Sequence, residues 1–254
     1  MKKSFTCCLI LIACVLIISP VRGFAEDTSK EGVPKEDLAT LTKFTTALQK
    51  GDKETVASLI EYPLVRETPL KDIKDKEEFL KYYEDYFDKE TIPQVLKDAK
   101  SPWNNWQGTA TRNGLIWIEG NFIRTLNVST KKLEERLKTA KGNDSTTLYA
   151  SAKGYDKLLV DCKTKKHKIR IQKHGEVYKY FSWNNKKSLS SKPEMELSGS
   201  LEIEGSAGNE VYTFKNKEYS YVFYAPHVCS GEEDCSPTLT VSKKEKELSV
   251  ETCD

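Results

Sequence analysis

The spacing of apolar residues changes midway along this chain of 254 residues, and that change restricts the fold more than any other feature. In the first half, Leu38, Leu41, Phe44 and Leu48 recur at the spacing of one helix face. From about residue 157 onward, short runs of apolar residues are separated by turn residues, a pattern typical of antiparallel strands. The sequence therefore predicts an α+β half followed by an all-β half.

Two further helices are predicted in the first half. Gly51 ends the first helix, and Asp52 can cap a second one that stops at Tyr62-Pro63. Asp75 and Glu78 have the spacing of a capping box and would open a third helix. The apolar positions of this third helix form a wide aromatic stripe, namely Phe79, Tyr82, Tyr83, Tyr86 and Phe87.

A small meander is predicted after these helices. Asn113-Gly114 lies between two extended runs, which favours a hairpin with a type I′ turn. Residues 121–128 predict one more strand. Helices followed by a meander indicate an α+β unit.

Five segments of this half resemble exported bacterial members of the nuclear transport factor 2-like superfamily. They are Ala47–Ile60, Tyr62-Pro63-Leu64, Phe79-Leu80 with Tyr83, Asn105–Gly108 and Asn113–Trp117. The resemblance covers residues 36–128 and implies cone-like helices on a curved antiparallel sheet, with a cavity between them. Members of this superfamily range from enzymes to binding domains, so the resemblance does not supply an activity.

The chain departs from that family pattern after Val128. Residues 129–156 predict a charged helical insertion, centred on Lys131–Lys141, and then a polar linker over 143–154. Residues 157–254 predict an antiparallel domain with eight strands, arranged as a sandwich or a barrel. The expected strands are 158–162, 168–172, 177–183, 196–204, 210–214, 219–224, 239–241 and 248–251. Because Ile169 and Ile171 alternate with Arg170 and Gln172, one face of this sheet is expected to contact water.

The N-terminus is typical of a secretory leader. Met1-Lys2-Lys3 precedes an apolar run over 7–18 that is too short to span a bilayer comfortably, and Gly23-Phe24-Ala25 places small residues before a cleavage site. We therefore expect a signal peptide of residues 1–25 and a bacterial protein that is periplasmic or secreted, with no transmembrane segment once the signal is removed. Two alternatives stay open. One is an uncleaved anchor, and the other is lipidation at Cys14, although the apolar run continues past that cysteine.

Charge argues against a nucleic-acid partner. Removing residues 1–25 takes away two lysines, one arginine and no acidic residue, so the formal net charge falls from +2 to −1. A balanced surface of this kind has no electrostatic attraction for nucleic acid or for an anionic membrane. The chain has only six arginines, and lysine is the poorer residue for bidentate recognition of phosphate.

Four cysteines remain after the leader, and an oxidising compartment favours two disulfides among them. Of the three possible connectivities, we favour Cys229–Cys235 as a local staple and Cys162–Cys253 as a tie from the start of the domain to its end. A zinc site is the rival interpretation, but Cys-x5-Cys is poor zinc spacing. No dinucleotide, phosphate-loop or metal-helix motif occurs, so no cofactor or metal is predicted.

Seven residues of the first half are candidates for a ligand pocket. Asp85 and Tyr82 share a helix face and would suit acid–base chemistry, the two arginines could pair with a ligand carboxylate, and the tryptophans could line the walls. Each residue also has a structural interpretation, as a solvated acid, a core aromatic or a surface arginine. The candidates are Arg66, Tyr82, Asp85, Tyr86, Trp106, Trp117 and Arg124.

A second candidate site is the acidic loop between Cys229 and Cys235. A disulfide would hold Glu232, Glu233 and Asp234 on a rigid turn that suits insertion into a basic site of a partner. The same loop could simply be solvated.

These features favour an exported, non-enzymatic binding protein. Its partner would be an envelope protein or a small-molecule ligand, and an inhibitor or immunity protein acting on an envelope partner is one concrete version. Two alternatives are kept. The first is a cavity enzyme, an isomerase or hydrolase of the nuclear transport factor 2-like type, and the second is a structural component of the envelope.

Overall fold

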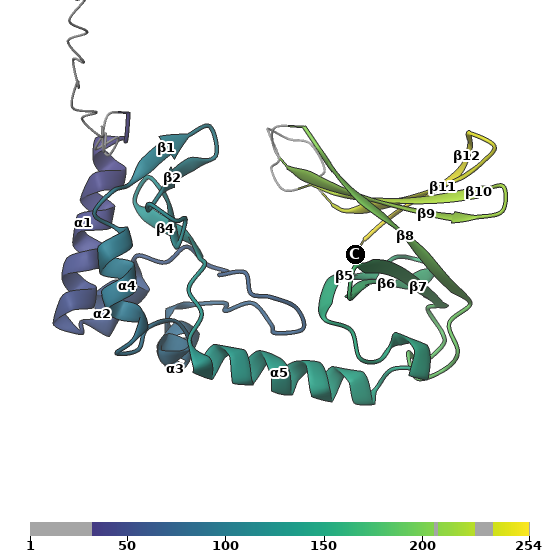
Figure 1. Ribbon diagram of the computed structural model, residues 1–254, viewed down its shortest axis with the longest axis horizontal. Helices are drawn as coiled ribbons and strands as arrows, with labels where there is room; N and C mark the ends of the chain where they lie inside the picture. Colours follow the sequence, from purple (N-terminus) through teal and green to yellow (C-terminus); the bar gives the residue numbers. More distant parts are fainter. Residues whose placement is uncertain (1–31, 206–207, 227–235, 254) are drawn as a thin grey trace, which may run out of the picture.

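The computed structural model describes residues 32–205, 208–226 and 236–253. These residues form five α-helices, one 3-10 turn and two antiparallel sheets (Figure 1). Helices α1 to α4 and a four-stranded sheet make the N-terminal unit, and an eight-stranded sheet makes the C-terminal unit. The structure therefore confirms a mixed α+β protein with a sheet-rich C-terminal part.

The N-terminal helices begin and end largely where the sequence predicts. Their bounds are α1 (Lys35–Lys50), α2 (Lys53–Ser58), α3 (Lys76–Tyr86) and α4 (Thr91–Asp98). Gly51 ends α1 in the left-handed conformation, at φ 68°. The Asp52 carboxylate accepts a hydrogen bond from the Thr55 backbone at 3.0 Å, and Asp75 accepts one from Glu78 at 2.8 Å. These two caps satisfy backbone donors that the first turn of each helix leaves free.

The four-stranded sheet is a meander in the order β1-β2-β3-β4. Its strands are β1 (Trp103–Asn105), β2 (Gly108–Ala110), β3 (Ile116–Glu119) and β4 (Phe122–Leu126). The side chains of Phe44, Phe79 and Phe87 are buried together with Ile118 and Ile123 from the sheet. Core side chains thus occupy the space between helices and sheet, where the family resemblance implied a cavity.

The predicted hairpin is present, but its turn is not type I′. The Gly114 N–H donates to the Thr111 carbonyl oxygen at 2.8 Å, so the central residues are Arg112 and Asn113, and neither has a positive φ; Gly114, which follows them, has a φ of 71°. Asn113 is held instead by the buried carboxylate of Asp98, which accepts bonds from its backbone at 2.9 Å and from its side-chain amide at 2.5 Å. This contact from α4, an element that the sequence analysis did not predict, selects the turn conformation.

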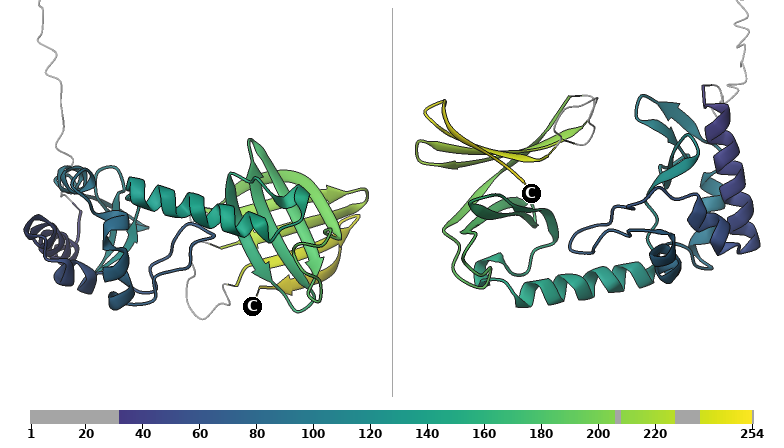
Figure 2. Two further views of the ribbon diagram at one scale, coloured as in Figure 1. Left: turned by 90° about the horizontal axis from the view of Figure 1, so that it is seen from below. Right: turned by 180° about the vertical axis from the view of Figure 1, so that it is seen from behind.

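A single long helix, α5 (Lys131–Thr146), leads from the N-terminal unit to the second sheet. The predicted helix over 131–141 is confirmed, and it begins where the Thr130 hydroxyl accepts a bond from the Leu133 backbone at 3.1 Å. Both units lie on the same side of α5 (Figure 1, Figure 2). The predicted linker over 143–154 begins within α5, and the residues after the helix pack against the second sheet through the buried Leu148, Ala152 and Tyr155.

The C-terminal sheet contains all eight predicted strands and joins them as one continuous meander, β5 to β12. It curls into a half-barrel (Figure 2). Among the described residues the first and last strands, β5 and β12, form no ladder with each other. The strands are β5 (Lys157–Lys163), β6 (His167–His174), β7 (Val177–Asn184), β8 (Met195–Glu204), β9 (Asn209–Asn216), β10 (Tyr219–Ala225), β11 (Thr238–Lys243) and β12 (Lys246–Thr252).

The longest strand, β8, passes from the β5–β7 layer to the β9–β12 layer (Figure 1). A Cβ atom added at Gly199, in the middle of β8, would lie 2.1 Å from the Thr213 carbonyl oxygen and 2.4 Å from the Phe214 ring. The Thr213 backbone and the buried Phe214 ring would both have to move to admit a methyl group at this position. Glycine therefore lets β8 and β9 approach closely where the sheet bends.

We expect Gly199→Ala to lower the free energy of unfolding by roughly 2–3 kcal/mol, because the added methyl group overpacks the bend. Gly142→Ala in α5 is the matched control. It adds a methyl group into open space within a helix and should raise stability by about 0.5–1 kcal/mol. Urea denaturation followed by far-UV circular dichroism measures both variants. Similar changes in the two variants would contradict the close approach of β8 and β9.

Both faces of the β5–β7 layer are covered, so the prediction of a water-exposed face is wrong there. Ile169 and Ile171 face the inner core of the half-barrel. Arg170 is 1% exposed, and its guanidinium forms a bidentate pair with Asp144 of α5, at 3.0 and 2.7 Å. The Tyr155 hydroxyl donates to the same carboxylate at 2.7 Å. This pairing attaches the end of α5 to the second sheet.

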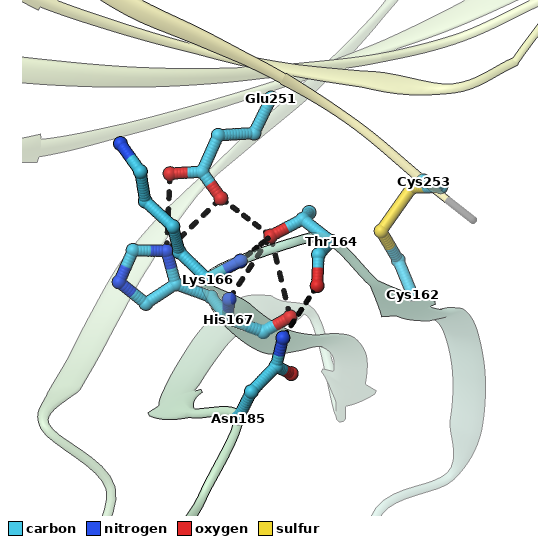
Figure 3. Close-up of a disulfide and its surroundings, with 7 residues drawn as sticks. All are labelled: Cys162, Thr164, Lys166, His167, Asn185, Glu251 and Cys253. Atoms are coloured by element: carbon cyan, nitrogen blue, oxygen red, sulfur yellow. Dashed lines mark hydrogen bonds and ion pairs between the residues drawn. A yellow bond between two sulfur atoms is a disulfide. The ribbon is translucent and has the colours of Figure 1, made fainter.

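The predicted Cys162–Cys253 disulfide joins the end of β5 to the residue that follows β12 (Figure 3). Beside it, the Glu251 carboxylate accepts a bond from the Thr164 hydroxyl at 2.5 Å and lies 3.1 Å from Nδ1 of His167. We call these five residues the clasp. The clasp ties the two edge strands at one end of the half-barrel. The other predicted pair, Cys229–Cys235, lies outside the described residues.

Glu251 makes the clasp sensitive to pH. Burial raises the pKa of Glu251, but the hydrogen bonds from Thr164 and His167 outweigh burial, and the resulting pKa is below 4.5. A lowered carboxyl pKa gives stability that is complete above the unfolded-state value and is lost as pH falls through the folded-state value. Between about pH 5 and pH 3, wild type should therefore lose stability more steeply than Glu251→Gln. Urea denaturation at each pH measures this, and equal slopes would contradict it.

Within the described ranges, no helix combines the length and apolar character needed to cross a bilayer.

Candidate functional site

Two cavities flank the segment 62–74, which extends beside α5 towards the second sheet (Figure 1). Leu64 and Ile73 hold the two arms of this segment together with backbone bonds of 2.8 and 3.0 Å. The smaller cavity, of about 520 Å³, lies between this segment, α3 and α5, and we call it the arginine pocket. The larger one, of about 900 Å³, is lined by both units and by α5, and we call it the interunit cleft.

Two guanidinium groups line the arginine pocket, and one carboxylate that is buried behind the pocket contacts both of them. Oδ2 of Asp85 lies 3.4 Å from Nη2 of Arg66 and 2.7 Å from Nε of Arg136. The Asp85 side chain is fully buried, and that of Arg66 is 4% exposed. Removing such groups from water is costly unless they are paired, so the three charges depend on one another.

Tyr82 orients both arginines. The guanidinium carbons of Arg66 and Arg136 lie 4.7 and 4.8 Å from the centre of its ring. A cation over an aromatic face is attracted by the quadrupole of the ring, and arginine is the cation most often found there. The ring therefore fixes where the two guanidinium groups point.

The charges of these three groups do not balance. Asp85 supplies one negative charge against the two positive charges of Arg66 and Arg136, and its Oδ1 atom has no hydrogen-bond partner. Nε of Arg66 is likewise buried without a partner. The pocket thus holds one surplus positive charge and a free donor, an arrangement that can bind an anion.

The interunit cleft has an apolar wall and a charged rim. Val65 is 75% exposed in the segment 62–74, although the adjacent Leu64 is buried. Arg124 forms an ion pair with Glu61 at 3.6 Å between Nε and Oε2. Tyr86 closes one side, and burial raises its pKa to about 12. The apolar lining includes Val65, Leu70, Leu126, Leu133, Leu137 and Leu159.

The structure brings together some of the predicted pocket residues and separates others. Arg66 and Tyr82 line the arginine pocket, and Asp85 is buried behind them in contact with Arg66; Tyr86 and Arg124 line the interunit cleft, as Arg66 also does. The two tryptophans line neither cavity, which corrects that prediction. Trp106 is 57% exposed in the turn between β1 and β2, and Trp117 packs edge-on against Trp103 at 5.4 Å. The acidic loop, Glu232 to Asp234, lies outside the described residues.

The sequence analysis missed Arg136. Arg136 lies in the segment that was predicted as a charged helical insertion, and most lysines of that helix are exposed. A usable signal was the scarcity of arginine. Arg66, Arg136 and Arg170 each contact a carboxylate that is buried or nearly so. An isolated arginine in a lysine-rich chain thus indicates a planar, bidentate or stacked contact here.

Comparisons with protein-family models, with curated proteins and with solved structures find no match for this chain. In the portion of the chain that is described, no group of three or more histidine, cysteine or acidic residues is arranged to hold a metal ion.

Proposed function

We propose that this chain is an exported, non-enzymatic binding protein of the cell envelope, periplasmic or secreted, and that the interunit cleft receives its partner. The observation that carries the proposal is a cleft of about 900 Å³ to which both units and α5 contribute. Cavities of this size and apolar character are typical of ligand sites. An inhibitor or immunity protein that acts on an envelope partner is the concrete version.

Exposed apolar side chains support the cleft as the contact surface. Val65 lines the cleft and exposes most of its surface to solvent there. Because this side chain is not buried, it contributes little to the stability of the fold. The adjoining walls are leucines, and the charged residues Glu61 and Arg124 lie at the rim. An apolar centre with a polar rim is the usual anatomy of a protein interface.

The isomerase or hydrolase alternative has less support. In that alternative Asp85 would exchange a proton with a ligand, but its Oδ2 atom already contacts Arg66 and Arg136. This geometry favours anchoring of charge over proton transfer. The helices and four-stranded sheet of residues 36–128 do support the further proposal of a nuclear transport factor 2-like unit with a cone-like arrangement.

The cellular location of the protein can be tested separately from its binding of a partner. We expect the full chain, expressed in a bacterium with a periplasm, to be recovered outside the cytoplasm with Glu26 as its first residue. Its four remaining cysteines should resist alkylation until the protein is reduced. Intact-mass measurement with and without reduction reports both properties. An intact Met1 together with free thiols on cytosolic protein would overturn the proposed export.

Site-specific photocrosslinking tests the cleft. A photoreactive amino acid in place of Val65 is expected to give one discrete adduct in envelope extracts, since this side chain faces the cleft. The same residue in place of Val177 is the control, because Val177 is also exposed, at 44%, but does not line the cleft. Adding Leu137→Asp should remove the Val65 adduct by placing a charge in the apolar wall. Equal labelling at both positions would contradict a partner in the cleft.

A further inference from the structure

We infer that the arginine pocket is a binding site for a carboxylate group of an organic ligand. The arginine pocket adjoins the proposed partner site and shares Arg66 and Leu70 with it, whereas Arg136 and Tyr82 line the arginine pocket and not the interunit cleft. A variant at Arg136 therefore tests the arginine pocket without altering a residue of the interunit cleft.

The surplus charge sets the charge of the ligand. Arg66 and Arg136 both contact Asp85, whose single negative charge balances only one of them; the Arg66 side chain is 4% exposed and that of Arg136 is 37% exposed. Lys132, at the mouth, is already paired with Glu84 at 2.7 Å. A carboxylate carries the single negative charge that neutralises this surplus, whereas a phosphate monoester carries about −1.5 to −2 at neutral pH.

The neighbouring acids strengthen this choice. Lys71, Glu78 and Glu135 also line the pocket, so this outer lining adds two negative charges against one positive charge and disfavours a doubly charged group more than a singly charged one. Glu78 is held in place, because its Oε2 atom accepts a bond from the Lys74 backbone at 2.8 Å. A doubly charged group would lie near the carboxylates of Glu78 and Glu135, and like charges at short range repel one another.

The hydrogen-bond donors and the apolar walls of the arginine pocket suit an organic acid. Nε of Arg66 is a buried donor without a partner, and a guanidinium edge fits the two oxygens of a carboxylate. Pro69, Leu70 and Ala140 supply an apolar wall beside the ring of Tyr82. An apolar body with one carboxylate would occupy both parts of the pocket. Free organic acids and the acidic end of a peptide share this chemistry.

Arginine side-chain NMR offers a direct test. After removal of the leader the chain contains five arginines, so a ¹⁵N-labelled sample gives at most five Nε–Hε signals. Benzoate is the free-acid probe, and acetyl-phenylalanine, which has a free C-terminal carboxylate, is the peptide probe, with acetyl-phenylalanine amide as its uncharged counterpart. We expect benzoate, or the peptide acid but not its amide, to shift the signals of Arg66 and Arg136 to saturation. Inorganic phosphate at equal ionic strength should not do so.

Variants separate the pocket from general surface binding. Arg136→Gln removes the surplus charge and leaves Arg66 paired with Asp85, so the fold should persist while affinity falls roughly tenfold or more. Arg112→Gln removes an exposed arginine that lines neither cavity and should leave the affinity unchanged. Circular dichroism confirms folding of each variant. The inference is overturned if the Arg66 and Arg136 signals do not saturate with either carboxylate, if phosphate saturates them equally, or if Arg136→Gln binds as wild type does.

Discussion

Replacing both Cys162 and Cys253 with alanine is expected to lower the free energy of unfolding by roughly 4 kcal/mol. The disulfide closes a loop across a sequence separation of 91 residues, so in the chain-entropy model its loss frees a large unfolded ensemble. Its position adds to this effect, because β5 and β12 share no described ladder. Urea denaturation, followed by the fluorescence of buried tryptophan and by circular dichroism, measures the loss.

The single variants provide the control for this experiment. Either Cys162→Ala or Cys253→Ala removes the whole crosslink, so each single variant should lose nearly as much stability as the double variant. Such non-additivity is the signature of two residues that act as one unit. If the double variant instead lost the sum of the two singles, packing of the thiols would explain the effect and the crosslink would not.

Arg170→Met is expected to cost roughly 3 kcal/mol or more. The substitution keeps an apolar stem of similar length but leaves the Asp144 carboxylate, which is 17% exposed, without its bidentate partner. It also leaves Tyr155 as the remaining donor to that carboxylate. Removing one member of a buried ion pair is far more costly than the pair is worth, because an uncompensated charge stays behind. Chemical denaturation at neutral pH measures the change.

A surface arginine gives the matched comparison. Arg124 also pairs with acids, Glu61 and Glu119, but its side chain is 51% exposed. Exposed pairs contribute about 1 kcal/mol or less, so Arg124→Met should have little effect. Double replacement of Arg170 and Asp144 by methionine and leucine should recover much of the lost stability, since no buried charge remains. Equal costs for the two arginine variants would show that burial of Arg170 does not matter.

Local patterns accounted for most of the strands and helices. Each strand of β5–β12 lies beside its neighbour in sequence, so periodicity and turn residues were enough to place all eight. The helix caps Asp52 and Asp75 were equally local signals. Helix α4 was missed because it is short and contains Pro93, which is tolerated there only because it lies in the first turn. The curl of the second sheet depends on the contact of Gly199 with β9, which no local pattern reveals.

The candidate site was predictable only where its residues are close in sequence. Tyr82 and Asp85 lie on one face of α3, and the spacing alone placed them together. Arg136 contacts Asp85 from α5. Arg170 of β6 pairs with Asp144 of α5, although the whole of β5 lies between them in the sequence. Such pairs are set by tertiary packing, so the sequence gives them no periodic signature. The same limit explains why Arg170 and Gln172 were expected to face water.

Helix α5 has a consequence for how the two units are aligned. Near its start Arg136 binds Asp85 of the N-terminal unit, and near its end Asp144 binds Arg170 of the second sheet. Each helical residue advances the chain about 1.5 Å and turns it about 100°. Inserting one residue between these anchors would swing one unit a quarter turn or more around the other, whereas inserting seven would nearly restore the phase. The number of α5 residues between the two anchors therefore sets the angle at which the two units face each other.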